Sequence, residues 1–396
     1  MYPVVTLKQR KEATVIHRHP WLFSGALSSV PEGLEQGSLV EVRDAAGRPL
    51  GVGTYSATSS IAVRVLDFRT VEIDGVWFAG RLRAADERRQ IMGYGPGTDT
   101  TGYRVVFGEA DGLPGLVVDR YDDVLVIQVS TSGMNRLKPL VLHALEAVFS
   151  PRAIYERSDL PSRKEEGLPE MAHALLGDPP EPVLFDEHGL KFLSDPVDGQ
   201  KTGFFLDQKD LRLWLRRLAS GRRMLNLFSY TGAHSVAALA GGTVSTLNVD
   251  ISPSALAMGQ RQAELNGMGG DRFVTEQADV FQWLAAERPE RYSLVVLDPP
   301  ALIKSAKDAE QGRKAYHFLC RAALRLVEDG GLFVFSSCSH HFTEDDLAFT
   351  LRRASVQAGV VLDPIANVRQ SADHPVSVYF PESAYLKTFI AQVRRT

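Results

Sequence analysis

The C-terminal half of the chain alternates strand-like and helix-like segments, and this pattern limits the fold more than any other feature. Such alternation predicts an α/β fold, in which a mostly parallel sheet carries helices on both faces. The predicted helices are His234–Ala240, Pro253–Asn266, Val280–Arg288 and Lys314–Glu328. The predicted strands are Met224–Phe228, Thr246–Val249, Phe273–Gln277, Leu294–Leu297, Leu332–Phe335 and Leu386–Val393.

The segments before residue 182 follow different patterns. Up to residue 72, short alternating strands such as Ser38–Arg43 and Ile61–Leu66 predict a small β-barrel or sandwich. Residues 73–181 combine two helical segments, from Val76 to about Met92 and Arg136–Phe149, with further strands, which indicates a small α+β domain. A proline-rich linker at Gly177–Pro182 closes it. We therefore predict three domains, 1–72, 73–181 and 182–396.

Composition excludes several classes of protein. The 396 residues include only two cysteines, Cys320 and Cys338, too few for a disulfide framework or a thiolate zinc site, and no metal is expected. No apolar window reaches the roughly 18 residues that a membrane span needs, and Lys8 and Arg10 follow too short an apolar run for a signal peptide. A cytoplasmic protein without membrane contact is therefore expected.

The loop after the first strand of the C-terminal sheet is the first candidate binding site. Ligands of open α/β sheets lie beyond the carboxyl ends of the strands. Small and hydroxyl residues before Gly232 allow the backbone to approach a ligand there. Asp250 ends the next strand, where a carboxylate can accept hydrogen bonds from ribose hydroxyls. Ser252 and Pro253 also fit a plain helix start, and the two interpretations are compatible.

The absence of a dinucleotide-binding motif limits the class of ligand that this loop is expected to bind. The loop lacks the full G-x-G-x-x-G pattern of dinucleotide enzymes, which favours an adenosyl ligand over NAD. Asp279, after the third strand, either accepts a hydrogen bond from an adenine amino group or only caps the following helix. Both alternatives stay open.

Two further strand ends carry candidate catalytic residues. Asp298-Pro299-Pro300 fixes a carboxylate at the end of the fourth strand, where it suits a flat heterocycle beside the cofactor. Cys338 ends the fifth strand among polar residues, whereas Cys320 fits a buried apolar helix. A thiolate that attacks C6 of a pyrimidine makes C5 nucleophilic enough to accept a methyl group.

These motifs in this order resemble, over essentially the whole chain, the bacterial 23S rRNA cytosine-C5 methyltransferases with an N-terminal PUA domain. Five motifs carry the resemblance: Lys201–Gln208, Leu225–Gly232, Asp250, Asp298-Pro299-Pro300 and Ser337–Ser339. The first block resembles a PUA domain through Arg18-His-Pro-Trp21. The resemblance implies a Rossmann-like domain with a seven-stranded sheet, S-adenosylmethionine as cofactor, and 23S rRNA or a large-subunit precursor as substrate.

The resemblance also assigns roles to residues. Cys338 would be the nucleophile, and Asp298 would orient the base through N3 and the exocyclic amine. The base that removes the C5 proton stays unassigned. Tyr316, Phe204 and Phe205 are either aromatic candidates for stacking on the flipped base or simply core residues. Cofactor contacts are expected at Thr202, Gly203, Phe204, Asp207, Gln208, Asn226, Phe228, Ser229, Tyr230, Thr231, Gly232, Asp250, Ser252, Asp279 and Asp298, and RNA contacts at Lys8, Arg10, Lys11, Arg18 and Trp21.

Three alternatives stay open at this point. The target could be an exocyclic amine of adenine or guanine, although Ala301 replaces the aromatic residue that usually follows Asp-Pro-Pro in such enzymes. The target could also be C5 of uracil. Finally, the chain could be an RNA-binding protein with a non-catalytic cofactor domain. The sequence leaves a homodimer open.

Overall fold

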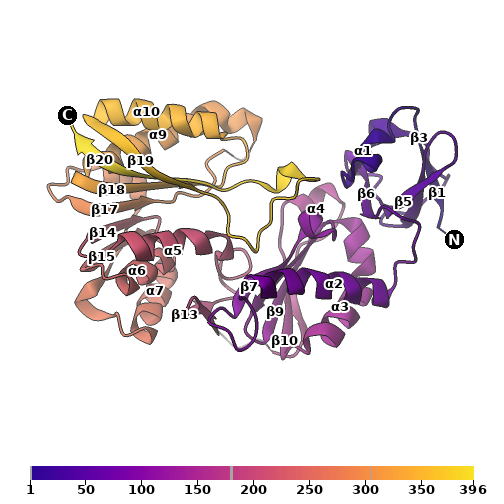
Figure 1. The fold of residues 1–396 in the computed structure, drawn as a ribbon, viewed down its shortest axis with the longest axis horizontal. Coiled ribbons are helices and arrows are strands. Elements are labelled where there is room, and N and C mark those ends of the chain that lie inside the picture. Colours follow the sequence, from indigo (N-terminus) through magenta and orange to yellow (C-terminus); the bar gives the residue numbers. More distant parts are fainter. Residues whose placement is uncertain (1, 179–181, 304) are drawn as a thin grey trace. The chain divides into compact units, whose positions relative to one another are not determined.

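The structure, a computed structural model, describes residues 2–178, 182–303 and 305–396 (Figure 1). Residues 179–181 of the predicted linker therefore lie outside the described part of the chain. The chain forms two compact units. Unit 1 comprises Met1–Gly189, Leu193–Leu206 and Ala372–Ser383, and unit 2 comprises Leu190–Phe192, Asp207–Ser371 and Ala384–Thr396.

Unit 1 begins with a six-stranded sheet. Its apolar side chains alternate along the strands, so Val5, Val40 and Val63 meet in one core. The short helix α1 (Ala13–Ile16) contributes Val15 to this core. The strands, in spatial order, are β2 (Trp21–Phe23), β6 (Ile61–Asp67), β5 (Pro49–Tyr55), β4 (Leu39–Arg43), β1 (Val4–Leu7) and β3 (Leu27–Ser29).

A five-stranded sheet with two long helices forms the rest of unit 1. Helices α2 (Gly75–Ile91) and α3 (Ser132–Phe149) pack together beside it (Figure 1). A short helix α4 (Ser162–Glu165) follows β10. The strands, in spatial order, are β11 (Met171–Leu176), β10 (Ala153–Ser158), β9 (Val124–Val129), β8 (Leu116–Tyr121) and β7 (Gly102–Phe107). A separate two-stranded sheet pairs β12 (Val183–Glu187) with β13 (Leu190–Ser194).

Unit 2 is built on a seven-stranded sheet. Four of its pairings are parallel, but β20 is antiparallel to both of its neighbours, β18 and β19. The sheet is therefore mixed, which refines the expectation of a mostly parallel one. In spatial order the strands are β16 (Phe273–Gln277), β15 (Ser245–Asp250), β14 (Arg223–Leu227), β17 (Tyr292–Leu297), β18 (Val327–Ser337), β20 (Lys387–Arg395) and β19 (Val360–Val368).

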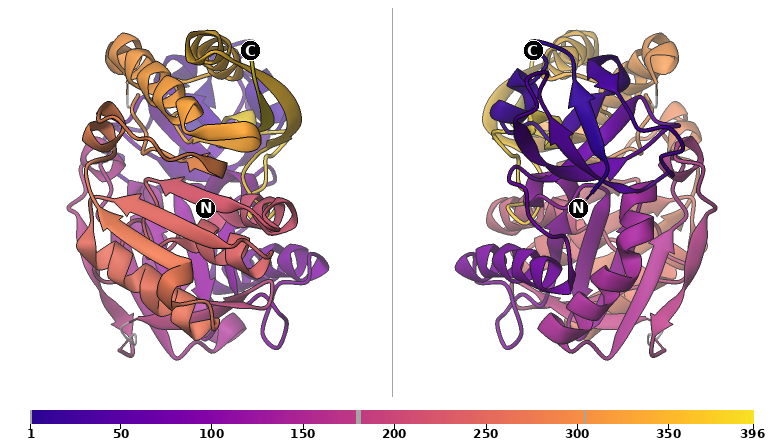
Figure 2. Two further views of the ribbon diagram at one scale, coloured as in Figure 1. Left: turned by 90° about the vertical axis from the view of Figure 1, so that its left-hand side faces the viewer. Right: turned by 90° about the vertical axis from the view of Figure 1, so that its right-hand side faces the viewer.

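Helices cover both faces of this sheet, as predicted (Figure 2). Successive strand residues point to opposite faces, so Leu225 joins the core under one layer of helices and Met224 joins the core under the other. The first layer is α8 (Val280–Ala285), α9 (Ala309–Arg325) and α10 (Glu344–Ala358). The second layer includes α5 (Lys209–Leu218) and α6 (Ala233–Ala240), and α7 (Pro253–Leu265) packs on α6 and β16.

The connection between β19 and β20 leaves unit 2 and returns to it. Residues 372–383 belong to unit 1, where the side chain of Arg89 donates to the carbonyl oxygen of Asp373 at 2.8 Å. The backbone N–H of Arg104 donates to the Asp373 carboxylate at 3.0 Å, and the neighbouring His374 is buried. We call residues 372–383 the excursion.

Within the described residues, no helix is both long enough and apolar enough to cross a bilayer.

Candidate functional site

The strands of unit 2 that carry the candidate residues end at the same edge of the sheet. Leu227 pairs with both Val249 and Leu297, and Leu297 pairs with Phe335. Because these four strands run parallel, the segments that follow them start side by side. The sequence prediction that the site residues share this edge is confirmed within unit 2.

The loop after β14 holds an unusual backbone conformation. Phe228 and Tyr230 have φ values of 59° and 47°, although residues with side chains rarely adopt positive φ. Gly232 has φ 65°, and a Cβ atom at this position would lie 2.5 Å from the ring of Phe273. Such strain persists only where surrounding contacts enforce it, and it concentrates at ligand sites.

Asp250 holds this loop in place. Its Oδ2 accepts the backbone N–H of Tyr230 at 2.8 Å, and its Oδ1 accepts the backbone N–H of Ser252 at 2.9 Å. Each carboxylate oxygen has a second lone pair, so the half-buried carboxylate can also accept from ribose hydroxyls. Ser252 is the N-cap of α7, where its hydroxyl accepts from Ala255 N at 3.2 Å.

Asp279 has the capping role that the sequence offered as one alternative. It is the N-cap of α8 and accepts from the backbone N–H of Gln282 at 3.0 Å. The cap leaves lone pairs for another donor, so the adenine contact of Asp279 stays a prediction.

Buried polar atoms without a partner mark the same region. Within the described residues, Oε1 of Gln208, Oδ1 of Asn226, Oγ of Ser229 and Nε2 of His234 are buried and lack a hydrogen-bond partner. Buried polar atoms in proteins are rarely left without one. A cofactor that supplies hydroxyl, amino and carboxylate groups would satisfy them, so these residues fit S-adenosylmethionine.

His234 enters the site as a neutral ring. Burial, aided by the positive charge of Arg212, lowers the pKa of His234 to about 3. Its ring therefore carries one N–H donor and one acceptor at neutral pH.

Asp298 is oriented by a glutamine. The side-chain amide of Gln208 donates to Oδ2 of Asp298 at 2.9 Å, so two predicted residues from distant segments lie together. Asp298 is partly exposed, whereas the following Pro299 is buried and anchors the corner. Beside Gln208, Asp207 accepts a hydrogen bond from the hydroxyl of Tyr385 at 2.6 Å.

Cys338 follows the last residue of β18 and is partly exposed. Its two neighbours are buried and bonded to Tyr316: the hydroxyl of Ser337 donates to Tyr316 Oη at 3.1 Å, and the Ser339 hydroxyl lies 2.8 Å from it. Residues 338–341, which follow β18 and which we call the Cys338 loop, are thus held in place on both sides of the thiol.

The structure separates the two thiols as predicted. Cys320 is fully buried in α9, and burial raises its pKa well above the ordinary value, so it is an inert thiol. Tyr316 is also fully buried, which favours the alternative that it is a core residue over stacking on a base. Its hydroxyl is hydrogen-bonded to Ser337 and Ser339 and so holds the Cys338 loop.

The expected cofactor contacts within Lys201–Gln208 are divided between the two units. Asp207 and Gln208 belong to unit 2, whereas Thr202, Gly203 and Phe204 belong to unit 1. In unit 1 the Thr202 hydroxyl donates to Asp119 at 2.6 Å and Phe204 is buried. The structure does not place these three residues against the strand ends of unit 2, and their cofactor contact stays a prediction.

Four of the candidate RNA contacts lie in the segment between β1 and β2 of unit 1, and the fifth, Trp21, begins β2. Lys8, Arg10, Lys11 and Arg18 are exposed, as phosphate contacts need to be. Trp21 is partly buried: its indole N–H donates to Glu109 at 2.8 Å, and its ring packs edge-on against Phe380, with centroids 4.7 Å apart. The RNA contacts stay predictions.

Lys387 is a residue at this edge that the sequence patterns did not single out. It begins β20 and lies opposite Ser337 at the end of β18, because these two strands are antiparallel. A lysine that begins a strand carries no signal unless the direction of that strand is known.

Among the described residues, no cluster of three or more His, Cys, Asp or Glu could hold a metal ion.

Comparisons with known proteins agree with this geometry. Residues 165–351 match the S-adenosylmethionine-dependent methyltransferase model, and residues 5–68 match the PUA-like domain model. The chain is 38% identical over 391 residues to ribosomal RNA large subunit methyltransferase I of Serratia proteamaculans, covering 98% of each chain. It is 36% identical over 396 residues to the enzyme of the same name from Salmonella arizonae, covering 99% of this chain and 98% of the relative.

A solved structure of a methyltransferase complexed with SAH has the same fold, with a TM-score of 0.83 and 23% identity, covering 98% of this chain and 100% of that one. A SAM-dependent methyltransferase from Streptococcus mutans matches with a TM-score of 0.82, 23% identity and the same coverage. These two structures show the fold, and the family model matched by residues 165–351 establishes the cofactor as S-adenosylmethionine. The chain belongs to the family of S-adenosylmethionine-dependent ribosomal RNA large subunit methyltransferases with an N-terminal PUA-like domain.

Proposed function

We propose that this enzyme methylates C5 of a cytosine in the RNA of the large ribosomal subunit, with Cys338 as the nucleophile. The names of the full-length relatives support the substrate. The observation that carries the chemistry is the position of Cys338, a partly exposed thiol in a rigid loop at the edge where β17 delivers Asp298. Methylation of an amine would need no thiol at this position.

The reaction uses the thiol twice. The thiolate of Cys338 attacks C6, an S–C6 bond forms, and the electrons of the C5=C6 double bond become available at C5. S-adenosylmethionine supplies the methyl group from its sulfonium, to which the electrons of the broken S–CH₃ bond return. A base, to which no side chain is assigned, then takes up the C5 proton. The electrons of the C5–H bond re-form the C5=C6 double bond, and the S–C6 bond breaks to release the thiolate of Cys338.

Asp298 would orient the base. Its carboxylate accepts from the exocyclic amine of cytosine and from N3 when N3 carries a proton. Gln208 supports this role, because its amide fixes Oδ2 of Asp298 by a hydrogen bond of 2.9 Å. A fixed carboxylate loses less freedom when the base binds.

Cofactor contacts are proposed for the loop after β14 and its neighbours. Asp250 would accept from the ribose hydroxyls, and Asn226, Ser229 and Gln208 would use their unsatisfied buried atoms. The exposed basic residues near the N-terminus would contact RNA phosphates, which determine affinity rather than sequence choice.

The decisive experiment compares Cys338→Ala with Cys320→Ala on deproteinised 23S rRNA, with S-adenosylmethionine labelled in the methyl group. Cys338→Ala is expected to lose transfer, because the nucleophile is gone, whereas Cys320→Ala removes only a buried thiol and should retain it. Full transfer by Cys338→Ala would disprove the covalent route.

The nature of the product separates the remaining targets. Digestion of the methylated RNA followed by mass spectrometry should yield 5-methylcytidine. Recovery of 5-methyluridine or of an N-methylated purine would instead support one of the other targets. RNA that contains 5-fluorocytidine should form a denaturant-stable adduct with the wild-type enzyme, since fluorine at C5 blocks the final elimination.

A further inference from the structure

Lys387 lies next to the nucleophile and has no part in the reaction as described so far. In the antiparallel pairing of β18 with β20, Lys387 is opposite Ser337, the residue before Cys338. Side chains of directly opposite residues lie on the same face of a sheet. The lysine therefore shares one face of the sheet with Ser337 and begins β20 beside the Cys338 loop.

Two hydrogen bonds fix the ammonium group. Nζ of Lys387 donates to the carbonyl oxygen of Ser339 at 3.0 Å and to the carbonyl oxygen of Tyr385 at 2.9 Å. Ser339 is the residue after Cys338, so the lysine joins β20 to the Cys338 loop. A lysine side chain that is free in solution adopts many rotamers, and these bonds select a conformation that keeps the charge at the loop.

Several charged groups face Lys387 from the elements packed around it. They are Cys338 in its loop, Glu344 and Asp346 on α10, and Arg369 after β19; His340 in the Cys338 loop also senses the lysine charge. Burial lowers the pKa of Lys387, while Cys338 and the two carboxylates oppose this effect by favouring the ammonium form.

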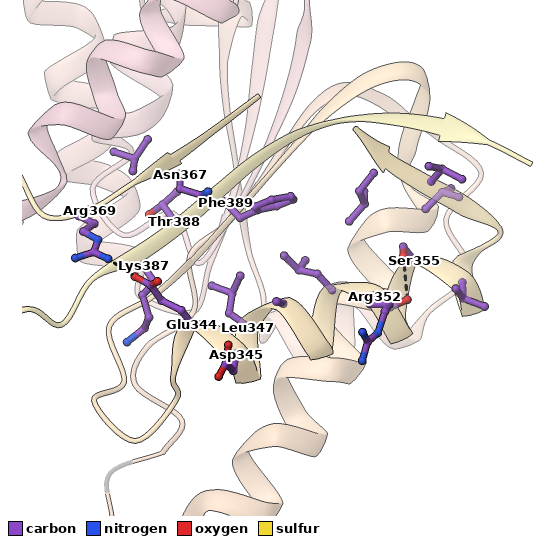
Figure 3. Close-up of a pocket in the computed structure, with 17 residues that line it drawn as sticks. Glu344, Asp345, Leu347, Arg352, Ser355, Asn367, Arg369, Lys387, Thr388 and Phe389 are labelled. Carbon is purple, nitrogen blue, oxygen red and sulfur yellow. Dashed lines mark hydrogen bonds and ion pairs between the residues drawn. The ribbon is translucent and has the colours of Figure 1, made fainter. Parts of the chain in front are cut away.

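Both carboxylates already have arginine partners. Glu344 pairs with Arg369 at 2.6 Å, and Asp346 pairs with Arg313 at 2.8 Å. Figure 3 shows Lys387 near the paired Glu344 and Arg369, at the rim of a groove of about 780 Å³ between α10 and the strands β19 and β20. The charge of the ammonium is therefore not fully neutralised by the carboxylates and acts on the thiol as well.

We propose that Lys387 is a positioning residue for methyl transfer, which holds the Cys338 loop and favours the thiolate of Cys338. This proposal rests on the proposed function. A cation beside the thiol would assist both ends of the reaction, because the same thiolate attacks C6 and later leaves it. An unperturbed thiol has a pKa of about 8.5, so only a few per cent is thiolate at neutral pH without such help.

The test measures the thiol itself, without RNA or cofactor. The rate of alkylation of Cys338 by iodoacetamide is followed from pH 5.5 to 9.5 in a Cys320→Ala background, because only the thiolate reacts. Lys387→Gln should slow alkylation at pH 7 about tenfold and move the midpoint of the profile up by about one pH unit. Lys387→Arg should restore most of the wild-type rate, since it keeps the charge.

Lys314→Gln is the matched control. Lys314 is exposed on α9 and pairs with Glu310 at 2.7 Å, so the variant makes the same charge change away from the thiol and should leave the profile unchanged. An unchanged profile for a folded Lys387→Gln variant would overturn the role of Lys387.

One further measurement keeps the proposal testable. If Lys387→Gln does not fold, native and urea-unfolded protein that carries only Cys320→Ala are compared, so that Cys338 is the thiol that reacts in both states. A native thiol that reacts at pH 7 no faster than the unfolded thiol would also overturn the proposal. The proposed function fails separately: full methylation by Cys338→Ala would remove the reaction that Lys387 is proposed to serve, whatever the alkylation profile.

Discussion

Replacement of Asp250 by alanine should weaken cofactor binding through two effects that can be measured separately. The ribose hydroxyls would lose the carboxylate that accepts their charge-assisted hydrogen bonds. The backbone N–H groups of Tyr230 and Ser252, which donate to this carboxylate at 2.8 Å and 2.9 Å and hold the loop after β14, would also lose their acceptor. The loop contains Tyr230 at φ 47°, a conformation that needs such support.

The size of the first effect follows from the number and kind of bonds. Hydrogen bonds to a charged group contribute about 1.5–3 kcal/mol, which corresponds to a dissociation constant raised about 10- to 150-fold. The second effect should lower the free energy of unfolding of the free enzyme by about 1–3 kcal/mol, because two backbone N–H groups lose their acceptor. Asp250 is only half-buried, so water can replace part of this loss.

Isothermal titration calorimetry with S-adenosylhomocysteine measures the first effect, and urea unfolding measures the second. Thr343→Ala is a suitable control, because it removes the capping box of α10 and should cost about 1 kcal/mol of stability without touching the cofactor loop. A dissociation constant of Asp250→Ala within twofold of the wild-type value would refute the reasoning and show that the ribose is held elsewhere.

The remaining predictions concern stability and the nucleophile loop. Glu166→Gln should lower the free energy of unfolding of unit 1 by about 3 kcal/mol at pH 7, because the buried Glu166 pairs with Arg64 at 2.7 Å. Burial raises the pKa of Glu166, but Arg64 and the hydrogen bonds from Ser132 and Ser56 together outweigh burial and lower the pKa. The difference from wild type in urea unfolding should therefore shrink as the pH falls below about 4.3; a difference independent of pH would contradict this. Gly232→Ala should weaken S-adenosylhomocysteine binding in calorimetry at least tenfold, because the new Cβ meets the Phe273 ring at 2.5 Å and φ is 65°; unchanged affinity would count against the role of this turn. Tyr316→Phe should reduce the methylation rate while preserving cofactor affinity, because the loop loses its anchor at Ser337 and Ser339; equal rates would argue that the loop is rigid without it.

The sequence predicted those parts of the site that depend on local patterns. The strand Phe273–Gln277 has the predicted bounds, and Asp250 and Asp298 lie at strand ends as expected. These successes share a physical cause: in a parallel sheet, buried strands appear as apolar runs, and the residue after each run must lie at the ligand edge.

Long-range contacts could not be predicted in the same way. The bond between Arg89 and Asp373 joins residues 284 positions apart, and no local pattern in either segment indicates the other. The antiparallel direction of β20, which brings Lys387 to Cys338, depends on where the excursion returns the chain. Helix α5 was missed because its many charged residues mask the apolar positions Leu211 and Leu215.

The excursion means that this protein cannot be divided into independent pieces by a single cut. The chain passes from unit 1 to unit 2 at residue 190, returns for residues 193–206, and returns again for residues 372–383. A fragment that ends at residue 189 would lack the buried His374 and the partner that Phe380 provides for Trp21. During synthesis, unit 1 would stay incomplete until nearly the whole chain has left the ribosome. Unit 1 would therefore be completed late, at nearly the same time as β20, the strand that carries Lys387, joins the sheet of unit 2.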